Sequence, residues 1–120
     1  MSSIQYQDKQ VVLYKELMLI NKYYFPLATS KTIMFSDVEK VALIDSEGVT
    51  HSWGVCGKYL NNWFPYDSDR KNKKKFIEIQ LKGGRKIKPS ITPDDPQKVF
   101  QLIWENHTAE GHEYVEKHTQ

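Results

Sequence analysis

The sequence has 120 residues, of which 39% are hydrophobic and 27% are charged, and this is the size and composition of one ordinary domain. These fractions exclude a disordered chain, collagen and a disulfide scaffold, and no stretch approaches the roughly 18 apolar residues of a membrane helix. The N-terminus lacks the regions of a signal peptide, and the one cysteine, Cys56, can form no internal disulfide. We therefore expect one cytoplasmic domain over residues 1–120, with its core at about 10–108 and a flexible tail at about 109–120.

Alternating side chains in the first half of the chain predict a series of short strands. Residues 17–25 form a predicted strand with one face more polar than the other, in which Leu17, Leu19, Asn21, Tyr23 and Phe25 alternate with Met18, Ile20, Lys22 and Tyr24. After a turn at 28–30, the same period predicts strands over 31–35, 38–44 and 49–56. Gly48 supplies the turn before the last of these.

The second half of the chain predicts a hairpin followed by a helix. Residues 57–72 are expected to be irregular, and 73–82 to form a half-buried strand. Gly83-Gly84 predicts a tight turn into a partner strand over 85–91, in which Pro89 indicates a sheet edge or a strand end. The period then changes to that of a helix over about 96–108, with either Asp95 or Thr92 as its N-cap. The order indicates a mostly β fold of antiparallel strands, closed by one C-terminal helix.

The net charge of +2 is unevenly distributed along the chain. Residues 70–88 hold nine basic residues and one acidic residue, whereas 1–69 and 91–120 both carry a net negative charge. A basic segment of this kind can bind phosphates or anionic lipid headgroups, although we favour a solvated surface, because runs of charge usually serve solubility. The candidate anion-binding residues are Arg70, Lys71, Lys73, Lys74, Lys75, Lys82, Arg85, Lys86 and Lys88.

Aromatic residues near the basic segment have two explanations. Trp63, Phe64, Tyr66 and Phe76 could stack on single-stranded nucleic acid, but aromatic side chains usually fill a core. We favour the core, and so argue against a nucleic-acid partner. Arg70 is expected to pair locally with Asp67 or Asp69.

No residue pattern indicates catalysis, a metal or a cofactor. The spacings between His107, His112 and His118 do not fit ligands on one helical face, and a solvated tail explains them better. His51 lies five residues from Cys56, on the opposite face of an extended strand, so we expect a buried and inert thiol. The common nucleophile, zinc and nucleotide-binding motifs are absent from the sequence.

Tyrosines in the first 25 residues suggest self-association. A small sandwich is not expected to bury all four of these tyrosines, Tyr6, Tyr14, Tyr23 and Tyr24. An edge strand that exposes some of them could pair with a second copy of the chain.

Several segments resemble bacterial pleckstrin-homology-like domains. They are KIKPSITPDDPQKVFQLI (86–103), YYFP (23–26), KTIMFSDVEKV (31–41) and WFPYDSDRKNKKKFIEI (63–79), and the resemblance extends over about residues 10–108. It implies a partly open antiparallel barrel or sandwich of about seven strands, capped by one C-terminal helix, with no shared catalytic residues. Eukaryotic relatives often bind phosphoinositides through a basic loop between the first two strands. Here that turn, residues 26–30, is short and uncharged.

The resemblance and the residue patterns together predict a non-catalytic binding or scaffold module. The leading hypothesis is interaction with a protein partner or self-assembly. The alternative is peripheral binding of anionic lipid headgroups through residues 70–88.

Overall fold

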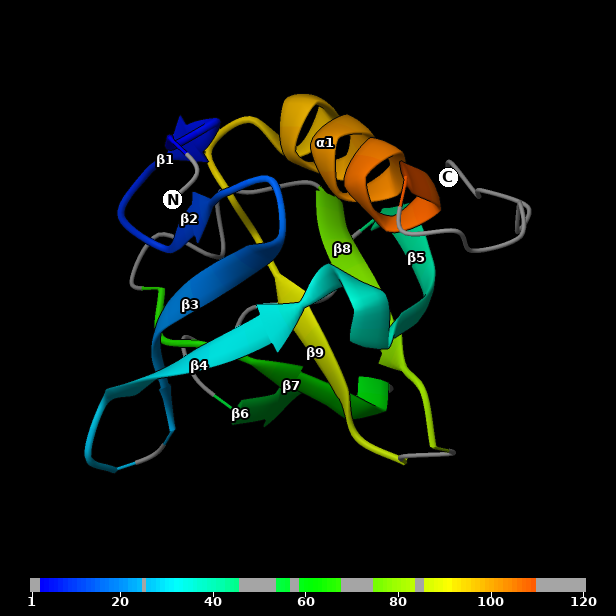
Figure 1. The fold of residues 1–120 in the computed structure, drawn as a ribbon. Coiled ribbons are helices and arrows are strands. Elements are labelled where there is room, and N and C mark those ends of the chain that lie inside the picture. Colours follow the sequence, from blue (N-terminus) through cyan, green and yellow to red (C-terminus); the bar gives the residue numbers. More distant parts are fainter. Residues whose placement is uncertain are drawn as a thin grey trace.

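A computed structural model describes residues 3–24, 26–45, 54–56, 59–67, 75–83 and 86–109. Within these residues, nine strands form two sheets, and one α-helix lies across one end of them (Figure 1). The architecture is a β-sandwich with a C-terminal helix, as the residue patterns predict. The strands divide into two sheets and do not close into a barrel.

The first sheet is an antiparallel meander of the N-terminal strands in the order β1-β2-β3-β4. Its strands are β1 (Tyr6–Gln7), β2 (Val11–Leu13), β3 (Leu17–Tyr24) and β4 (Thr29–Met34). Strands β1 and β2 lie before the first predicted strand, and Tyr6 packs against the core. Because β3 lies between β2 and β4, it is no edge strand, and the prediction of an edge rich in tyrosines is wrong for β3.

The second sheet has the order β5-β8-β9-β7-β6. A short 3-10 helix η1 (Phe35–Asp37) leads into β5 (Val38–Asp45). The other strands are β6 (Gly54–Cys56), β7 (Tyr59–Phe64), β8 (Lys75–Leu81) and β9 (Lys88–Ile91). Strands β5 and β8 confirm the predicted strands over 38–44 and 73–82, and β6 covers the end of the strand predicted over 49–56.

Two features of this sheet correct the sequence analysis. Strand β7 lies in the segment expected to be irregular, and it pairs with β9 in parallel, with Trp63 opposite Pro89. The prediction of purely antiparallel pairing is therefore wrong for this pair. Strand β9 lies between β8 and β7, so Pro89 is not at a sheet edge, but it is the second residue of β9, which agrees with the alternative prediction of a strand end. Strand β8 pairs with β9 at Ser90 and Ile91 and not at Pro89. The missing N–H of Pro89 therefore costs no hydrogen bond to β8.

The connection between β8 and β9 is longer than the predicted tight turn. It runs over residues 82–87, because pairing of the two strands begins only at Ser90. Gly83 adopts a φ of 94°, which fits a glycine at the start of the turn. Gly84 and Arg85 lie outside the described residues.

Helix α1 (Pro96–Ala109) confirms the predicted C-terminal helix. Its N-cap is Asp95, whose Oδ1 accepts a hydrogen bond from the Lys98 backbone N–H at 3.2 Å. Val99 and Ile103 are fully buried, and the helix packs on β5, β8 and η1. Each such aliphatic side chain contributes roughly 1.5–3 kcal/mol on burial, so this face of α1 holds the helix on the sandwich.

The alternative cap residue, Thr92, has another role. Its hydroxyl donates to Asp67 Oδ2 at 2.8 Å, and its backbone N–H donates to Gln10 Oε1 at 2.6 Å. Both Gln10 and Thr92 are buried. The hydrogen bonds of Asp67 to Thr92 and Gln10 tie the loop before α1 to the N-terminal strands. Arg70 and Asp69, the other residues of the predicted local ion pair, lie outside the described residues.

Candidate functional site

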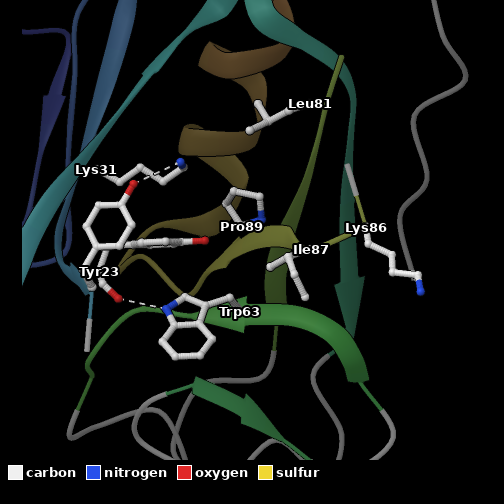
Figure 2. Close-up of a pocket in the computed structure, with 8 residues that line it drawn as sticks. Tyr23, Lys31, Trp63, Leu81, Lys86, Ile87 and Pro89 are labelled. Carbon is white, nitrogen blue, oxygen red and sulfur yellow. Dashed lines mark hydrogen bonds between the residues drawn. The ribbon is translucent and has the colours of Figure 1, made fainter. Parts of the chain in front are cut away.

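A cleft of about 570 Å³ opens between the first sheet and the end of the second sheet near the β8–β9 connection (Figure 2). This volume lies in the range of ligand and partner pockets. Strands β3, β4, β7, β8 and β9 and the β8–β9 connection each contribute at least one lining side chain. The lining residues are Tyr23, Tyr24, Lys31, Trp63, Leu81, Lys86, Ile87 and Pro89.

A bulge in β3 places the two tyrosines at the cleft. Pairing of β3 with β4 shifts register between Ile20 and Tyr24, and Lys22 adopts the left-handed region with a φ of 52°. The alternation of faces is reversed there, so that Met18 and Ile20 are buried before the bulge and Tyr23 is buried after it. The predicted face that joined Leu17 and Leu19 to Tyr23 is therefore wrong.

Hydrogen bonding and ring contacts fix the aromatic wall of the cleft. The Trp63 indole Nε1 donates to the backbone oxygen of Tyr23 at 2.8 Å, which joins β7 to β3. The Tyr23 ring lies edge-on to Tyr24 at 5.0 Å and tilted against Trp63 at 6.3 Å. Burial raises the pKa of Tyr23 above its ordinary value, and Tyr24 adds a smaller contribution, so the Tyr23 hydroxyl stays protonated at neutral pH.

Two lysines supply the charge of the cleft. The Lys31 ammonium lies 5.5 Å from the Tyr23 ring centre and 5.6 Å from that of Tyr24, and it donates to the Tyr24 hydroxyl at 3.3 Å. Figure 2 shows Lys31 on the tyrosine side of the cleft and Lys86 on the other side. Tyr24 is 45% exposed and Ile87 is 46% exposed, which leaves apolar surface open between the lysines. The residues that line the cleft include no carboxylate.

The structure describes four of the nine predicted anion-binding residues, and these four have different surroundings. Lys75 pairs with Asp45 at 2.8 Å, and Lys88 lies 3.8 Å from Glu78. Lys75 begins β8 and the exposed Lys82 follows its last residue, so the two lie roughly 20 Å apart along the strand. Lys86 lines the cleft. Arg70, Lys71, Lys73, Lys74 and Arg85 lie outside the described residues. Of the four described members of the predicted set, Lys86 alone lines the cleft.

The aromatic residues near the basic segment divide between core and surface. Phe64 and Phe76 are buried against each other at 5.1 Å, which confirms the prediction that they belong to a core. Trp63 lines the cleft, and Tyr66 is 37% exposed beneath the Lys22 ammonium.

Of the candidate metal ligands and the candidate nucleophile, the structure describes the side chain of His107. His107 is buried in α1, so the expectation of a solvated histidine is wrong at this position. His112, His118 and His51 lie outside the described residues, as does the side chain of Cys56 in β6. Among the residues that the structure describes, no group of three or more histidine, cysteine, aspartate or glutamate side chains is placed to hold a metal.

Comparisons with protein-family models, with curated proteins and with solved structures found no match to this chain. Among the described residues, no helix is both long enough and apolar enough to cross a membrane.

Sequence reasoning missed most of the cleft. The sequence analysis counts Tyr23 and Tyr24 among four tyrosines that a small sandwich does not all bury, and it favours a core position for Trp63, but it does not join them to Lys31 and Ile87. The local signal nearest to the bulge is the polar pair Asn21-Lys22, which interrupts the apolar residues of β3.

Proposed function

We propose that this protein is a non-catalytic binding module that holds a protein partner at the cleft between its sheets. The observation that carries this proposal is a cleft with three aromatic rings, two lysines and half-exposed apolar side chains at Tyr24 and Ile87. Tyrosine and tryptophan are enriched at interfaces between proteins, because their rings bury much area at small entropic cost. The Trp63 ring is held by its hydrogen bond and the Tyr23 ring by its burial before any partner arrives, which reduces that cost further.

The chemistry of the lining residues supports a binding role over catalysis. The lining residues that the structure describes supply no carboxylate, histidine, cysteine, serine or threonine side chain. Of the groups that commonly serve as acid, base or nucleophile, they supply only tyrosine hydroxyls and lysine amines.

We further propose a pleckstrin-homology-like origin for the domain and a cytoplasmic location. The order of strands followed by one closing helix supports the first, as does the Thr-Pro-Asp-Asp-Pro turn that leads into α1. The single cysteine supports the second.

The alternative function is peripheral binding of anionic lipid in place of a protein partner. The exposed side chains of Lys82 and Lys86 in the β8–β9 connection favour it, because each exposed lysine adds to the attraction of an anionic surface. The ion pairs of Lys75 and Lys88 count against it, because these two charges are already compensated.

The test combines partner capture with vesicle binding. We expect the tagged protein to capture a partner from its host, and the purified partner to bind about tenfold more weakly when Tyr24→Ala and Ile87→Glu are combined. Lys98→Glu, an exposed change on α1, is the control and should leave partner binding unchanged. Binding that survives the cleft variant would overturn the proposal.

The vesicle arm tests the lipid alternative. Cosedimentation with vesicles of phosphatidylserine and phosphatidylcholine at low and high salt should recover no protein. Salt-sensitive binding that Lys73→Glu, Lys74→Glu and Lys75→Glu together abolish would favour the lipid alternative and contradict our proposal.

A further inference from the structure

Strand β4 forms one edge of the first sheet, and half of its backbone groups point away from β3. Within the described chain, no strand pairs with its outer side. The Phe35 backbone N–H donates to the Glu16 oxygen at 2.9 Å, and the pairing of Ile33 with Met18 continues that register. Because backbone groups alternate along an antiparallel strand, Thr32 and Met34 direct their N–H and C=O groups outward. Both residues are exposed, so this edge offers hydrogen bonds to a further strand.

The cleft lies where the side chains of such a strand would fall. On β4, Ile33 is buried in the core and Lys31 lines the cleft, so this face of the strand points between the sheets. A strand added along β4 would direct every second side chain to the same side. There it would meet the exposed apolar surface of Tyr24 and Ile87.

Charge determines the kind of segment that fits. Among the described residues, those that line the cleft include Lys31 and Lys86 and no carboxylate, and the exposed Lys82 lies near Lys86 along the chain. The Lys31 ammonium has three donors, and its bond to the Tyr24 hydroxyl leaves capacity for an incoming anion. Carboxylates on the added segment would complement this charge.

A second copy of the chain fits the site less well than an acidic segment. The residues of β4, Thr29–Met34, include one lysine and no acidic residue. Pairing two β4 edges would bring two sets of cleft lysines together, and a lysine on an edge strand opposes such pairing.

We propose that the β4 edge and the cleft together bind an acidic segment of a partner protein in extended conformation. The segment adds as a strand to β4, places an apolar side chain between Tyr24 and Ile87, and pairs carboxylates with Lys31 and Lys86. This inference rests on the proposed function and specifies the chemistry of the partner.

The first experiment selects peptides without assuming their sequence. A library of random decapeptides displayed on phage is panned against the full chain. We expect enrichment of Asp and Glu in alternation with apolar residues, which matches the two faces of an added strand. Enrichment of basic peptides, or no enrichment at all, would overturn the inference.

The second experiment measures the charge contribution with the strongest selected peptide. Fluorescence anisotropy should show binding about tenfold weaker or more for the double variant Lys31→Glu with Lys86→Glu. The control variant Lys98→Glu makes one lysine-to-glutamate change outside the cleft and should alter the affinity for the peptide by less than about twofold. Equal affinity of the double variant and the unaltered protein would contradict the proposed pairing.

The third experiment tests the backbone hydrogen bonds at the edge. Thr32→Pro removes an outward N–H and leaves the ladder with β3 intact, so the variant should fold and lose peptide binding. A peptide N-methylated at alternate positions should also fail to bind the unaltered protein, which provides a test that needs no protein variant. Binding unchanged in either case would rule out strand addition.

Two further outcomes separate this inference from the proposed function. A partner that the cleft variant Tyr24→Ala with Ile87→Glu loses, but that Thr32→Pro retains, would leave the proposed function standing and overturn strand addition. Dimerisation in sedimentation velocity that Thr32→Pro abolishes would assign the edge to a second copy and overturn the acidic partner.

Discussion

Lys22 shows how one residue determines the character of a surface. Its left-handed φ of 52° lies in the bulge of β3 and reverses the side on which the following residues lie. Tyr23 is therefore buried beside Trp63, whereas Tyr24 is exposed above Lys31. A non-glycine residue in this region costs on the order of 1 kcal/mol, which the packing of Tyr23 and the hydrogen bond from Trp63 offset.

Burial of Tyr23 predicts a loss of stability in alkali. Burial raises the pKa of Tyr23, so the folded state keeps a proton that the unfolded state releases above about pH 10. The contribution of Tyr23 is complete below pH 10 and falls as pH rises beyond it, by at most about 1.4 kcal/mol per pH unit.

Urea unfolding at pH 8 and pH 11 measures this effect. Tyr23→Phe keeps the ring and removes the titrating hydroxyl, so it should lose less stability between the two pH values than the unaltered protein. Part of the loss should remain, because burial and the hydrogen bond to Asp8 also raise the pKa of Tyr6. An identical pH dependence in the variant would show that Tyr23 does not contribute.

At the scale of elements, α1 is specified by its start and by its buried face. Asp95 caps the first turn, Pro96 occupies the first helical position, and Val99 and Ile103 pack on the sheet. These residues lie within one short segment, which is why the sequence predicts the helix without knowledge of the rest of the fold.

Loss of the cap predicts a moderate destabilisation. Asp95→Ala leaves an N–H of the first turn without its side-chain acceptor and should lower the free energy of unfolding by about 1 kcal/mol. Asp95→Asn retains an acceptor and should stay within a few tenths of a kcal/mol of the unaltered protein. Chemical denaturation compares the two, and equal losses would mean that the charge of Asp95 matters more than its hydrogen bond.

At the scale of the whole molecule, Asp8 joins the two ends of the fold. Its carboxylate accepts hydrogen bonds from the Tyr6 hydroxyl at 2.6 Å and from the Gln10 backbone N–H at 2.7 Å. It also accepts from the Val11 N–H and the Asp94 N–H, each at 2.9 Å. The last of these spans 86 positions of sequence and connects the β1–β2 turn to the loop before α1.

Removal of this carboxylate should affect the fold more than removal of the helix cap. We expect Asp8→Ala to lower the free energy of unfolding by about 2–3 kcal/mol, because several donors lose a charged acceptor at once. Lys9→Ala, an exposed change at the next position, should alter it by less than about 0.5 kcal/mol. Thermal and urea unfolding of both variants test this, and similar small losses would show that the turn holds without Asp8.

Long strands and the helix were predictable because their signal is local. Strands β3, β5 and β8 follow a period of two, and α1 follows the helical period with a cap at its start. Strand β7 was missed because consecutive asparagines, Asn61 and Asn62, interrupt its apolar residues. Asn62 is nevertheless buried, since its amide donates to Glu78 at 2.9 Å and to Ser90 at 2.8 Å on two other strands.

The sequence by itself determined strands β3, β5 and β8 and the closing helix, because side-chain spacing carries this information within a few residues. Only the tertiary structure decided the parallel pairing of β7 with β9, the reversal of faces at Lys22 and the assembly of the cleft. These features depend on partners far apart in the chain: Trp63 lies 40 positions from the Tyr23 oxygen to which it donates. The spacing of neighbouring residues does not predict such partners, because they meet only when both sheets pack around one core.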